Sequence, residues 1–316
     1  MKILITAGGS GGHIIPAESL YKFLKNNELC HWSVDTRGLK YTSEKPEYSW
    51  NSHGKNILVR IFKIFIYFFK SLWILRKYDT LISFGTYHSI PFLISAIILR
   101  KKIYLHEQNT QLSRVNKIFG MFGKVIGAWP NLGPNVFHGG MPLRPYEPNS
   151  PKDFKILIIF GSQEAPFLKP MLYKIFENIP KKIQKKITIL ADPNNFQIID
   201  GLHFKTQEFK TNFKENILSL YDGCSMAIGR GGAGFIYEML FLKKPFITIP
   251  IKKSVGNHQY FNGKYGVDTG LGCLIMEDED ISQGTQFILQ VFNKQIPIKD
   301  HYVIDNACQK IYDFIN

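Results

Sequence analysis

The sequence predicts an α/β protein made of two domains, each built around a parallel β-sheet. Three observations support this prediction. The chain has 316 residues, which is too long for one ordinary domain of this class and enough for two of about 150 residues each. It opens with an apolar strand that runs into a glycine-rich turn and a helix. The same order restarts after a proline-rich stretch near the middle of the chain.

The first half opens with a buried strand over Lys2–Ala7, where a short apolar run is stopped by glycine. The turn GGSGGH follows, and Pro16 then opens a predicted helix that extends to about Asn26, because proline suits the first turn of a helix. This succession is typical of a nucleotide-binding, Rossmann-like domain. Further strands are predicted over residues 31–36, 80–84, 103–106 and 125–128.

A proline-rich polar stretch over residues 142–151, PLRPYEPNSP, is typical of a linker. It divides the chain into expected domains of residues 1–145 and 146–316, although the last helix can pack back on the first domain. Two α/β domains joined by a hinge imply a cleft between them, which is a favoured place for a ligand. In the second half we predict strands over residues 155–160, 187–191, 226–229 and 246–250, and helices over 167–178, 213–221 and 232–242.

The charge of the chain limits the classes of molecule that it is expected to bind. Lys and Arg outnumber Asp and Glu by 39 to 25, a net charge of +14, which favours nucleic acid, anionic lipid or phosphorylated substrates. Nucleic acid ranks last, because the sequence lacks zinc-finger spacing and RNP-type aromatic motifs. The cysteines are scattered without a CxxC pair, so we expect reduced thiols, and the N-terminal apolar run is too short for a signal peptide, so we expect no export.

The segment over residues 57–78, ILVRIFKIFIYFFKSLWILRKY, is apolar but interrupted by basic residues, so spanning a bilayer is unfavourable. Arg60, Lys63, Lys70 and Lys77 share one helical stripe. The segment contains no acidic residue. It is either a core helix with one solvated edge or, as we favour, a basic amphipathic helix that lies on an anionic membrane surface.

Two glycine-rich turns can hold an anion. The first lacks the GxGxxG signature, because position 14 is Ile14, and the chain has no GxxxxGK[ST] sequence. Its bare N–H groups at a helix start still favour an anion or a sugar, and His13 beside it either serves a ligand or caps the helix. The second turn, residues 228–234, leads into a helix with Glu238, which can accept from ribose hydroxyls.

Two other polar clusters fit a polar ligand. His106–Glu107–Gln108–Asn109 follows a strand, and four such residues in a row are not expected in a core. Amide side chains in 257–262 can read sugar hydroxyls, or they can cap a helix. The Asp278–Asp280 pair is interpreted as acidic residues at a helix start rather than as a metal site, and no other cluster has metal-ligand spacing.

These motifs together resemble the MurG family, bacterial enzymes that move N-acetylglucosamine from UDP to a lipid-linked muramyl-peptide precursor of peptidoglycan. The matching segments, in family order, are residues 8–16 (GGSGGHIIP), 106–109 (HEQN), 161–165 (GSQEA), 230–238 (RGGAGFIYE) and 258–262 (HQYFN), with weaker matches at 85–91 (GTYHSIP) and 140–144 (GMPLR).

The resemblance implies a GT-B fold and an inverting transferase that needs neither metal nor cofactor. It implies UDP-N-acetylglucosamine and an undecaprenyl-linked muramyl-peptide as substrates, and a peripheral location on the cytoplasmic face of the inner membrane. His13 is the first candidate for the base. Glu238 would bind the ribose, and Arg144 with the glycine turns would face the diphosphate. The implied donor site is Ser10, Gly11, Gly12, Asn109, Arg144, Ser162, Ala233, Gly234, Phe235, Ile236, Tyr237, Glu238 and Gln259.

Some residues depart from the family pattern. Glu164 replaces a usual glycine and would repel a diphosphate unless it points away, and Phe235 replaces a small polar residue. Thr86, Ile90 and Met141 also differ. The alternatives are therefore another GT-B enzyme, such as a UDP-sugar 2-epimerase or a lipid-sugar transferase, and a degenerate UDP-sugar-binding protein.

Overall fold

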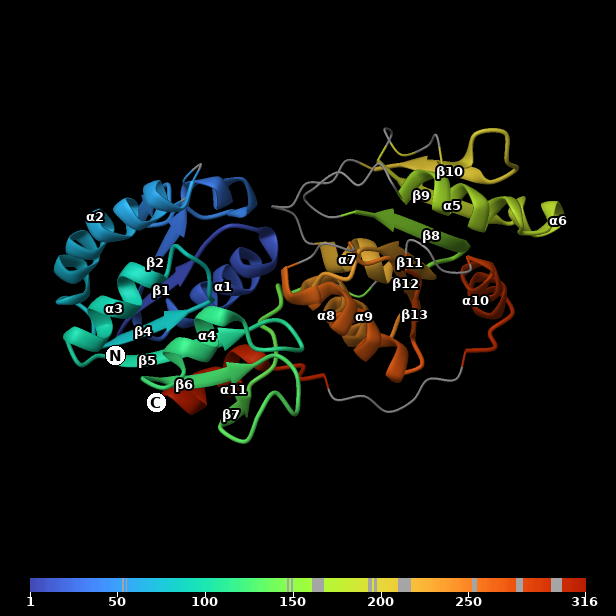
Figure 1. Ribbon diagram of the computed structural model, residues 1–316. Coiled ribbons are helices and arrows are strands. Elements are labelled where there is room, and N and C mark those ends of the chain that lie inside the picture. The colour runs from blue at the N-terminus through green and yellow to red at the C-terminus, as the bar shows by residue number, and fades with distance from the viewer. Residues whose placement is uncertain are drawn as a thin grey trace. The chain divides into compact units, whose positions relative to one another are not determined.

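The computed structural model (Figure 1) divides the chain into two compact units. One unit comprises Met1–Arg144 with Ile304–Asn316, and the other comprises Pro145–Val303. The structure describes residues 1–52, 54, 56–146, 148, 150–160, 168–192, 195, 198–209, 217–251, 255–276, 281–296 and 303–316.

In its described part, the first unit contains a parallel sheet with strand order β3-β2-β1-β4-β5-β6-β7. The central strands are buried on both faces, which explains why they read as nearly continuous apolar runs. The strands are β1 (Lys2–Ala7), β2 (Leu29–Asp35), β3 (Tyr48–Trp50), β4 (Thr80–Ser83), β5 (Lys102–Glu107), β6 (Lys124–Gly127) and β7 (Val136–His138).

Helical segments connect most of these strands, as parallel pairing requires, whereas β6 and β7 are joined by residues 128–135 without a helix. One core cluster joins the inner side of α2 to β4, β5 and α3, through side chains such as Leu75, Leu81 and Phe92. The helical segments are α1 (Gly11–Leu24), the 3-10 helix η1 (Thr36–Tyr41), α2 (Ile57–Leu75), α3 (Ile90–Ile98), α4 (Arg114–Phe119) and the C-terminal α11 (Ala307–Ile315).

Helix α11 belongs to the first unit although it comes last in the sequence (Figure 1). Its Tyr312 hydroxyl donates to Glu28 at 3.0 Å, and the Tyr104 hydroxyl donates to the carbonyl of Ile315 at 3.2 Å. The Phe314 ring stacks on Phe137 with centroids 3.9 Å apart. These contacts attach the end of the chain to the sheet that the first strands build.

The second unit repeats the architecture with strand order β10-β9-β8-β11-β12-β13, again parallel throughout its described residues. Its strands are β8 (Phe154–Ile159), β9 (Ile187–Ala191), β10 (Lys205–Glu208), β11 (Met226–Gly229), β12 (Phe246–Thr248) and β13 (Gly272–Leu274). Its helical segments are α5 (Leu168–Glu177), α6 (Lys181–Gln184), α7 (Ile217–Asp222), α8 (Ala233–Phe241), η3 (Val255–Asn257), α9 (His258–Asp268) and α10 (Ser282–Phe292).

In each sheet the order in which the chain adds strands changes direction at one point. A glycine-rich turn follows a strand at that point. In the first unit the reversal lies between β1 and β4, and in the second between β8 and β11. Ligands of open α/β sheets bind beyond the carboxyl ends of the strands at such reversal points. The turns after β1 and β11 are therefore the places where the fold itself favours a ligand.

Two local predictions were wrong. Helix α1 begins at Gly11 rather than at Pro16, which lies inside it and removes only the hydrogen bond to position 12. The second error is that four short strands, namely β3, β7, β10 and β13, were not predicted. In the described part of the chain, no helix combines the length and the apolar character needed to span a bilayer.

Candidate active site

The glycine-rich loop after β1 leads directly into the first helical turn of α1. Ser10 is the N-cap residue and is exposed, and its carbonyl accepts from the backbone N–H groups of His13 and Ile14 at 3.1 and 3.2 Å. The preceding N–H groups of a helix have no acceptor within the helix itself, so Gly11 and Gly12 offer donors to an anion. Gly8 must be glycine, because a Cβ there would lie 2.8 Å from the Cβ of His88.

A hydrogen-bonded chain runs from His13 to the backbone at Gly140. The Nδ1 atom of His13 lies 2.8 Å from Oε1 of Gln108, and Nε2 of Gln108 lies 2.9 Å from Nδ1 of His106. The Nε2 atom of His106 then donates to the carbonyl of Gly140 at 2.9 Å. His13 is half-buried, whereas His106 and Gln108 are buried. Burial lowers the pKa of His106 to about 4, although the bond to Gly140 and the charge of Glu107 oppose that shift.

The expectation that residues 106–109 lie outside the core was wrong for three of them. His106, Glu107 and Gln108 are buried, and only Asn109 is half-exposed. Hydrogen bonds explain why the buried carboxylate of Glu107 is stable there. Its oxygens accept from the backbone and side-chain nitrogens of Asn109, from the N–H of Ser113 and from the side chain of Asn116, at 2.7 to 3.0 Å. The motif thus builds the loop that carries Gln108 and Asn109.

A second buried polar cluster lies under the first glycine turn. His88 contacts the hydroxyls of Ser33 and Ser52 at 2.9 and 2.7 Å. Burial lowers the pKa of His88 to about 4, and nearby Asp35 opposes the shift. Burial raises the pKa of Asp35, but hydrogen bonds from Arg37 outweigh burial and leave it lowered. His88 and Asp35 approach Gly8 closely, so this cluster packs against the first glycine turn.

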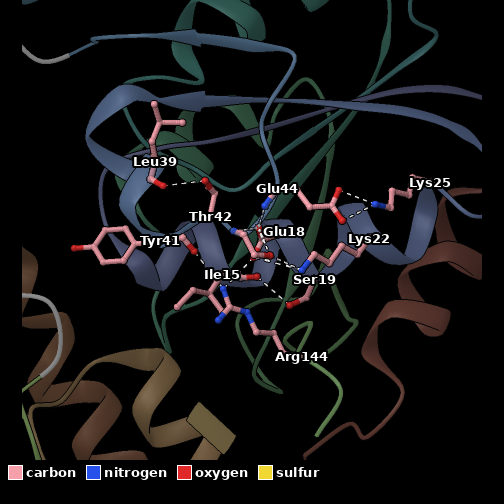
Figure 2. Close-up of polar contacts among 11 residues, drawn as sticks. Ile15, Glu18, Ser19, Lys22, Lys25, Leu39, Tyr41, Thr42, Glu44 and Arg144 are labelled. Carbon is pink, nitrogen blue, oxygen red and sulfur yellow. Dashed lines mark hydrogen bonds and ion pairs between the residues drawn. The ribbon is translucent and has the colours of Figure 1, made fainter. Parts of the chain in front are cut away.

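Arg144 lies in a different environment from the one expected. Its guanidinium donates to Oε2 of Glu18 at 2.9 Å and to the carbonyl of Tyr41 at 3.2 Å (Figure 2). The side chains of Arg144 and Glu18 are only 10% and 0% exposed. Glu18 also accepts from the backbone N–H groups of Ser43 and Glu44 at 2.6 and 3.1 Å. Arg144 is the last residue of the first unit before Pro145 and therefore anchors the start of the proline-rich stretch to that unit.

In the second unit, the turn after β11 is held by the start of α9. The backbone of Gly231 passes so close to Gln259 that a Cβ on Gly231 would lie 2.2 Å from the Gln259 carbonyl oxygen. The buried Asn262 side chain donates to the carbonyl of Gly231 at 3.1 Å. The Gln259 side chain accepts from the N–H of Ile251 at 3.0 Å, which leaves its –NH2 group as the end that can donate to a ligand.

Helix α8 starts at this turn with Gly232 as its N-cap. The N–H groups of Ala233, Gly234 and Phe235 belong to the first helical turn, where no acceptor exists within the helix. Their position suits a diphosphate. The side chains of Ile236 and Tyr237 are buried, so these two residues can offer a ligand only backbone groups.

The unusual Phe235 has a packing role. Its ring meets the rings of Tyr221 and Phe246 edge-on, with centroids 5.9 and 5.7 Å apart. It also approaches Gly229, where an added Cβ would lie 3.0 Å from the ring. Glu238 is half-buried on the same helix, and its charge contributes to raising the pKa of buried Tyr221, after burial itself.

The expected site residues thus gather in two places. His13 and the glycines beside it lie in the first unit with Asn109, while the α8 residues and Gln259 lie in the second. Ser162 and Glu164 lie outside the described residues, as do Asp278 and Asp280. Among the side chains that the structure does describe, no three His, Cys, Asp or Glu residues gather in a way that could hold a metal ion.

Sequence reasoning missed the residues that support His13. Gln108 and His106 were part of a motif expected to meet a polar ligand, and neither was expected to bond to His13. The available signal was polar residues at the end of β5, an otherwise apolar strand. Glu18 was missed because nothing in the sequence pairs it with Arg144, 126 positions later.

Helix α2 has two apolar sides. Its Ile74 and Leu75 pack in the core, whereas a second row of large apolar side chains is exposed. Phe62 is 63% exposed and Trp73 is 61% exposed. Lys77 stacks over the Trp73 ring at 4.3 Å. We call this row the α2 face: Leu58, Val59, Ile61, Phe62, Phe65, Ile66, Phe69 and Trp73.

Comparison with protein families covers most of the chain. Residues 3–127 match the model of the glycosyltransferase family 28 N-terminal domain, and residues 155–295 match that of the family 28 C-terminal domain. The chain is 30% identical to the UDP-N-acetylglucosamine–N-acetylmuramyl-(pentapeptide) pyrophosphoryl-undecaprenol N-acetylglucosamine transferase of Pelagibacter ubique, over 100% of this chain and 95% of that one. It is 31% identical to the protein of the same name from Rickettsia canadensis, over 90% and 88%.

Solved structures agree in fold. The chain resembles MurG of Acinetobacter baumannii with a TM-score of 0.77 and 21% identity, over 100% of this chain and 99% of that one. It also resembles the UDP-GlcNAc 2-epimerase of Methanocaldococcus jannaschii, with a TM-score of 0.68, 14% identity and coverage of 100% and 99%. At these identities the likeness shows the fold alone. The predicted GT-B class, with two parallel α/β sheets, is confirmed.

Proposed function

Because the chain belongs to glycosyltransferase family 28 and within it to the MurG family, we propose that it transfers N-acetylglucosamine from UDP-N-acetylglucosamine to an undecaprenyl-pyrophosphate-linked N-acetylmuramyl-pentapeptide. The observation that carries the proposal is the full-length match to relatives that bear this name, with 95% of the Pelagibacter ubique protein covered. The product is the disaccharide-peptide lipid used in peptidoglycan synthesis.

In the proposed reaction the acceptor hydroxyl attacks the anomeric carbon of N-acetylglucosamine from the face opposite UDP. The new bond joins the acceptor oxygen to that carbon, and the bond from the carbon to the diphosphate oxygen breaks, so UDP leaves with the electron pair. His13 takes the hydroxyl proton as general base, a role that histidine side chains often perform in enzymes. Inversion at the anomeric carbon follows from this single displacement.

The leaving diphosphate needs stabilisation. We propose that the first-turn N–H groups of α8, at Ala233, Gly234 and Phe235, donate to it, since donors aimed at developing negative charge lower the barrier. Glu238 would accept from the ribose, and the –NH2 group of Gln259 would donate to a sugar or phosphate oxygen. The N–H groups of Gly11 and Gly12 would also face the diphosphate, and Ser10 and Asn109 would complete the donor site. Ser162 is retained as a donor contact from the family resemblance.

We further propose that the α2 face docks on the anionic cytoplasmic surface of the inner membrane, where the lipid acceptor resides. A contiguous row of exposed large apolar side chains is unusual on a monomeric surface. The α2 face has Lys70, Arg76 and Lys77 beside it, all exposed. Aromatic side chains flanked by lysines suit the boundary between head groups and acyl chains, and each lysine adds attraction to anionic lipid.

The test is transfer of labelled N-acetylglucosamine from its UDP donor to the lipid-linked muramyl-pentapeptide in the presence of EDTA. We expect labelled lipid product, and loss of about 10²- to 10⁴-fold in kcat in His13→Gln with donor affinity retained. Lys40→Gln, a change on η1, is the matched surface control. Release of UDP without any acceptor would point instead to an epimerase, and binding of UDP-sugar with no transfer would point to a degenerate binding protein.

A further inference from the structure

We propose that Gln108 and His106 are positioning residues that hold the proton of neutral His13 on Nδ1, which makes Nε2 the basic nitrogen of the ring. The hydrogen-bond pattern carries this inference without reference to any substrate. It deepens the proposed function, because only a ring with its lone pair on Nε2 can take the acceptor proton at that atom while Nδ1 remains bonded to Gln108.

The hydrogen-bond assignment starts from the carbonyl oxygen of Gly140, which can only accept. The carbonyl oxygen of Gly140 lies 2.9 Å from Nε2 of His106, so Nε2 of His106 carries a hydrogen. His106 is buried, and its ring stacks on Phe84 with centroids 4.7 Å apart. Burial in this setting lowers the pKa of His106 to about 4, so its ring is neutral at pH 7. A neutral ring with hydrogen on Nε2 has an acceptor at Nδ1.

That acceptor fixes the orientation of Gln108. The group facing Nδ1 of His106 at 2.9 Å must be the –NH2 end of the Gln108 amide, which also donates to the carbonyl of His106 at 3.1 Å. Two acceptors therefore hold the same end of the amide. The opposite end, Oε1, then faces Nδ1 of His13 at 2.8 Å. An amide oxygen only accepts, so Nδ1 of His13 is the donor.

The backbone around these hydrogen-bonded side chains is also held in place. The indole of buried Trp129 donates to the carbonyl of Gln108 at 2.7 Å, and Asn116 donates to the carbonyl of His106 at 3.2 Å. Charged or titratable neighbours of the network are Glu107, whose charge favours a protonated His106, and His13, whose charge disfavours it. Nothing in this arrangement requires a proton to move from residue to residue. The hydrogen bonds therefore set the tautomer of His13 and do not relay charge.

The direct test reads the tautomer in the wild-type protein. Histidine labelled with ¹⁵N in both ring nitrogens distinguishes a protonated nitrogen from a lone-pair nitrogen by chemical shift, and His13→Gln identifies the His13 signals by their loss. At neutral pH we expect His13 to carry its hydrogen on Nδ1 and His106 on Nε2. A His13 ring with hydrogen on Nε2 would overturn the inference, whether or not the protein is active.

Two variants at one position separate positioning from packing. Gln108→Met keeps the length of the side chain and removes its polar atoms, so we expect His13 to lose its tautomer preference and kcat to fall by about ten- to hundred-fold, as expected for a misplaced proton in general base catalysis. Gln108→Glu keeps an oxygen that can accept from Nδ1 of His13, so it should retain the Nδ1–H tautomer. Its second oxygen faces Nδ1 of His106, which must then take up a proton, so we expect kcat to fall, but by less than in Gln108→Met.

If Gln108→Met and Gln108→Glu lose kcat equally while both keep the wild-type tautomer, the positioning role is refuted. The outcome is separate from that of the transfer assay. An inactive protein with His13 protonated on Nδ1 would refute the proposed function and leave the inference standing. An active protein with the other tautomer would do the reverse.

Discussion

The guanidinium of Arg144 donates to the carboxylate of Glu18 at 2.9 Å, across 126 positions of sequence. Both side chains are nearly inaccessible to solvent. The pair ties the start of the proline-rich stretch to the middle of α1. Arg144 was expected to face a diphosphate, and in the structure of the first unit its charge is already paired.

The first prediction concerns this pair. We expect Arg144→Met to lower the free energy of unfolding by about 3 kcal/mol, the low end for breaking a buried pair, because the buried carboxylate of Glu18 keeps only the half-exposed Lys22, 4.0 Å away, as its countercharge. Urea denaturation measures the loss. The double variant Glu18→Leu/Arg144→Met should regain part of it, since no charge then remains buried. If Arg144→Met weakens UDP binding and leaves stability unchanged, the diphosphate role is the correct one.

The second prediction concerns backbone strain beside the first glycine turn. Thr86 has a φ of 95°, in a region that a β-branched residue rarely adopts, and within the described residues its buried hydroxyl has no hydrogen-bond partner. Such strain costs about 1–3 kcal/mol. Glycine relieves it but loses about 0.5–1 kcal/mol through chain entropy.

We therefore expect Thr86→Gly to raise the free energy of unfolding by about 1 kcal/mol, the balance of those two effects. Thermal or urea unfolding measures it. Thr206→Gly is the control, because Thr206 lies in β10, where the same change has no strain to relieve and should destabilise. Equal losses in the two variants would show that Thr86 is not strained.

The third prediction concerns pH. Burial lowers the pKa of His88 and of His106 from 6.5 to about 4. The folded state therefore binds fewer protons than the unfolded state between these values, and stability is lost as pH falls from about 6.5 towards 4. Asp35 and Arg37 face His88, and Glu107 faces His106, so they share in the titration.

Each histidine should contribute about 1.4 kcal/mol per pH unit within that window. Urea unfolding at several pH values measures the slope. His88→Asn and His106→Asn should each reduce it by about one proton, whatever they do to stability at pH 7. A slope that is the same in wild type and both variants would show that neither histidine is held neutral.

The fourth prediction concerns the α2 face. Replacing Phe62 and Trp73 together by serine should weaken binding to phosphatidylglycerol-containing vesicles by tenfold or more, since burying each large apolar side chain is worth about 1.5–3 kcal/mol. Co-sedimentation measures the bound fraction. Leu29→Ser removes a large apolar side chain outside α2 that is 54% exposed, and it should have no effect.

The basic residues allow a second reading of the same assay. Lys70→Ala/Lys77→Ala should weaken binding to anionic vesicles by roughly 30-fold, at about 1 kcal/mol for each lysine near the surface, and leave binding to phosphatidylcholine vesicles unchanged. If the serine variant and the alanine variant both bind as the wild type does, the α2 face is not the docking surface.

The sequence predicted the parts of the fold that depend on local patterns. Strands such as β1 and β11 are buried on both faces, so they read as apolar runs, and glycine turns mark their ends. The four short strands were not predictable in this way. For example, β10 reads KTQE and is exposed throughout, so only its pairing with β9 makes it a strand.

The candidate site was predictable as motifs but not as contacts. The glycine turn at Gly231 could be found from composition, whereas its dependence on Gln259 and Asn262 comes from the tertiary packing of α9. Polar residues 106–108 were expected at the surface because burying them is costly. The structure buries them because each finds a partner, and no local pattern encodes partners as distant as Gly140.

The place of α11 in the first unit has a consequence for synthesis on the ribosome. The residues that complete this unit, 304–316, are translated only after the whole of the second unit has been made. Until they emerge, the surfaces that receive Phe314 and Tyr312 remain uncovered. The first unit therefore cannot be completed during synthesis until residues 304–316 have been made, by which time all of the second unit has been translated.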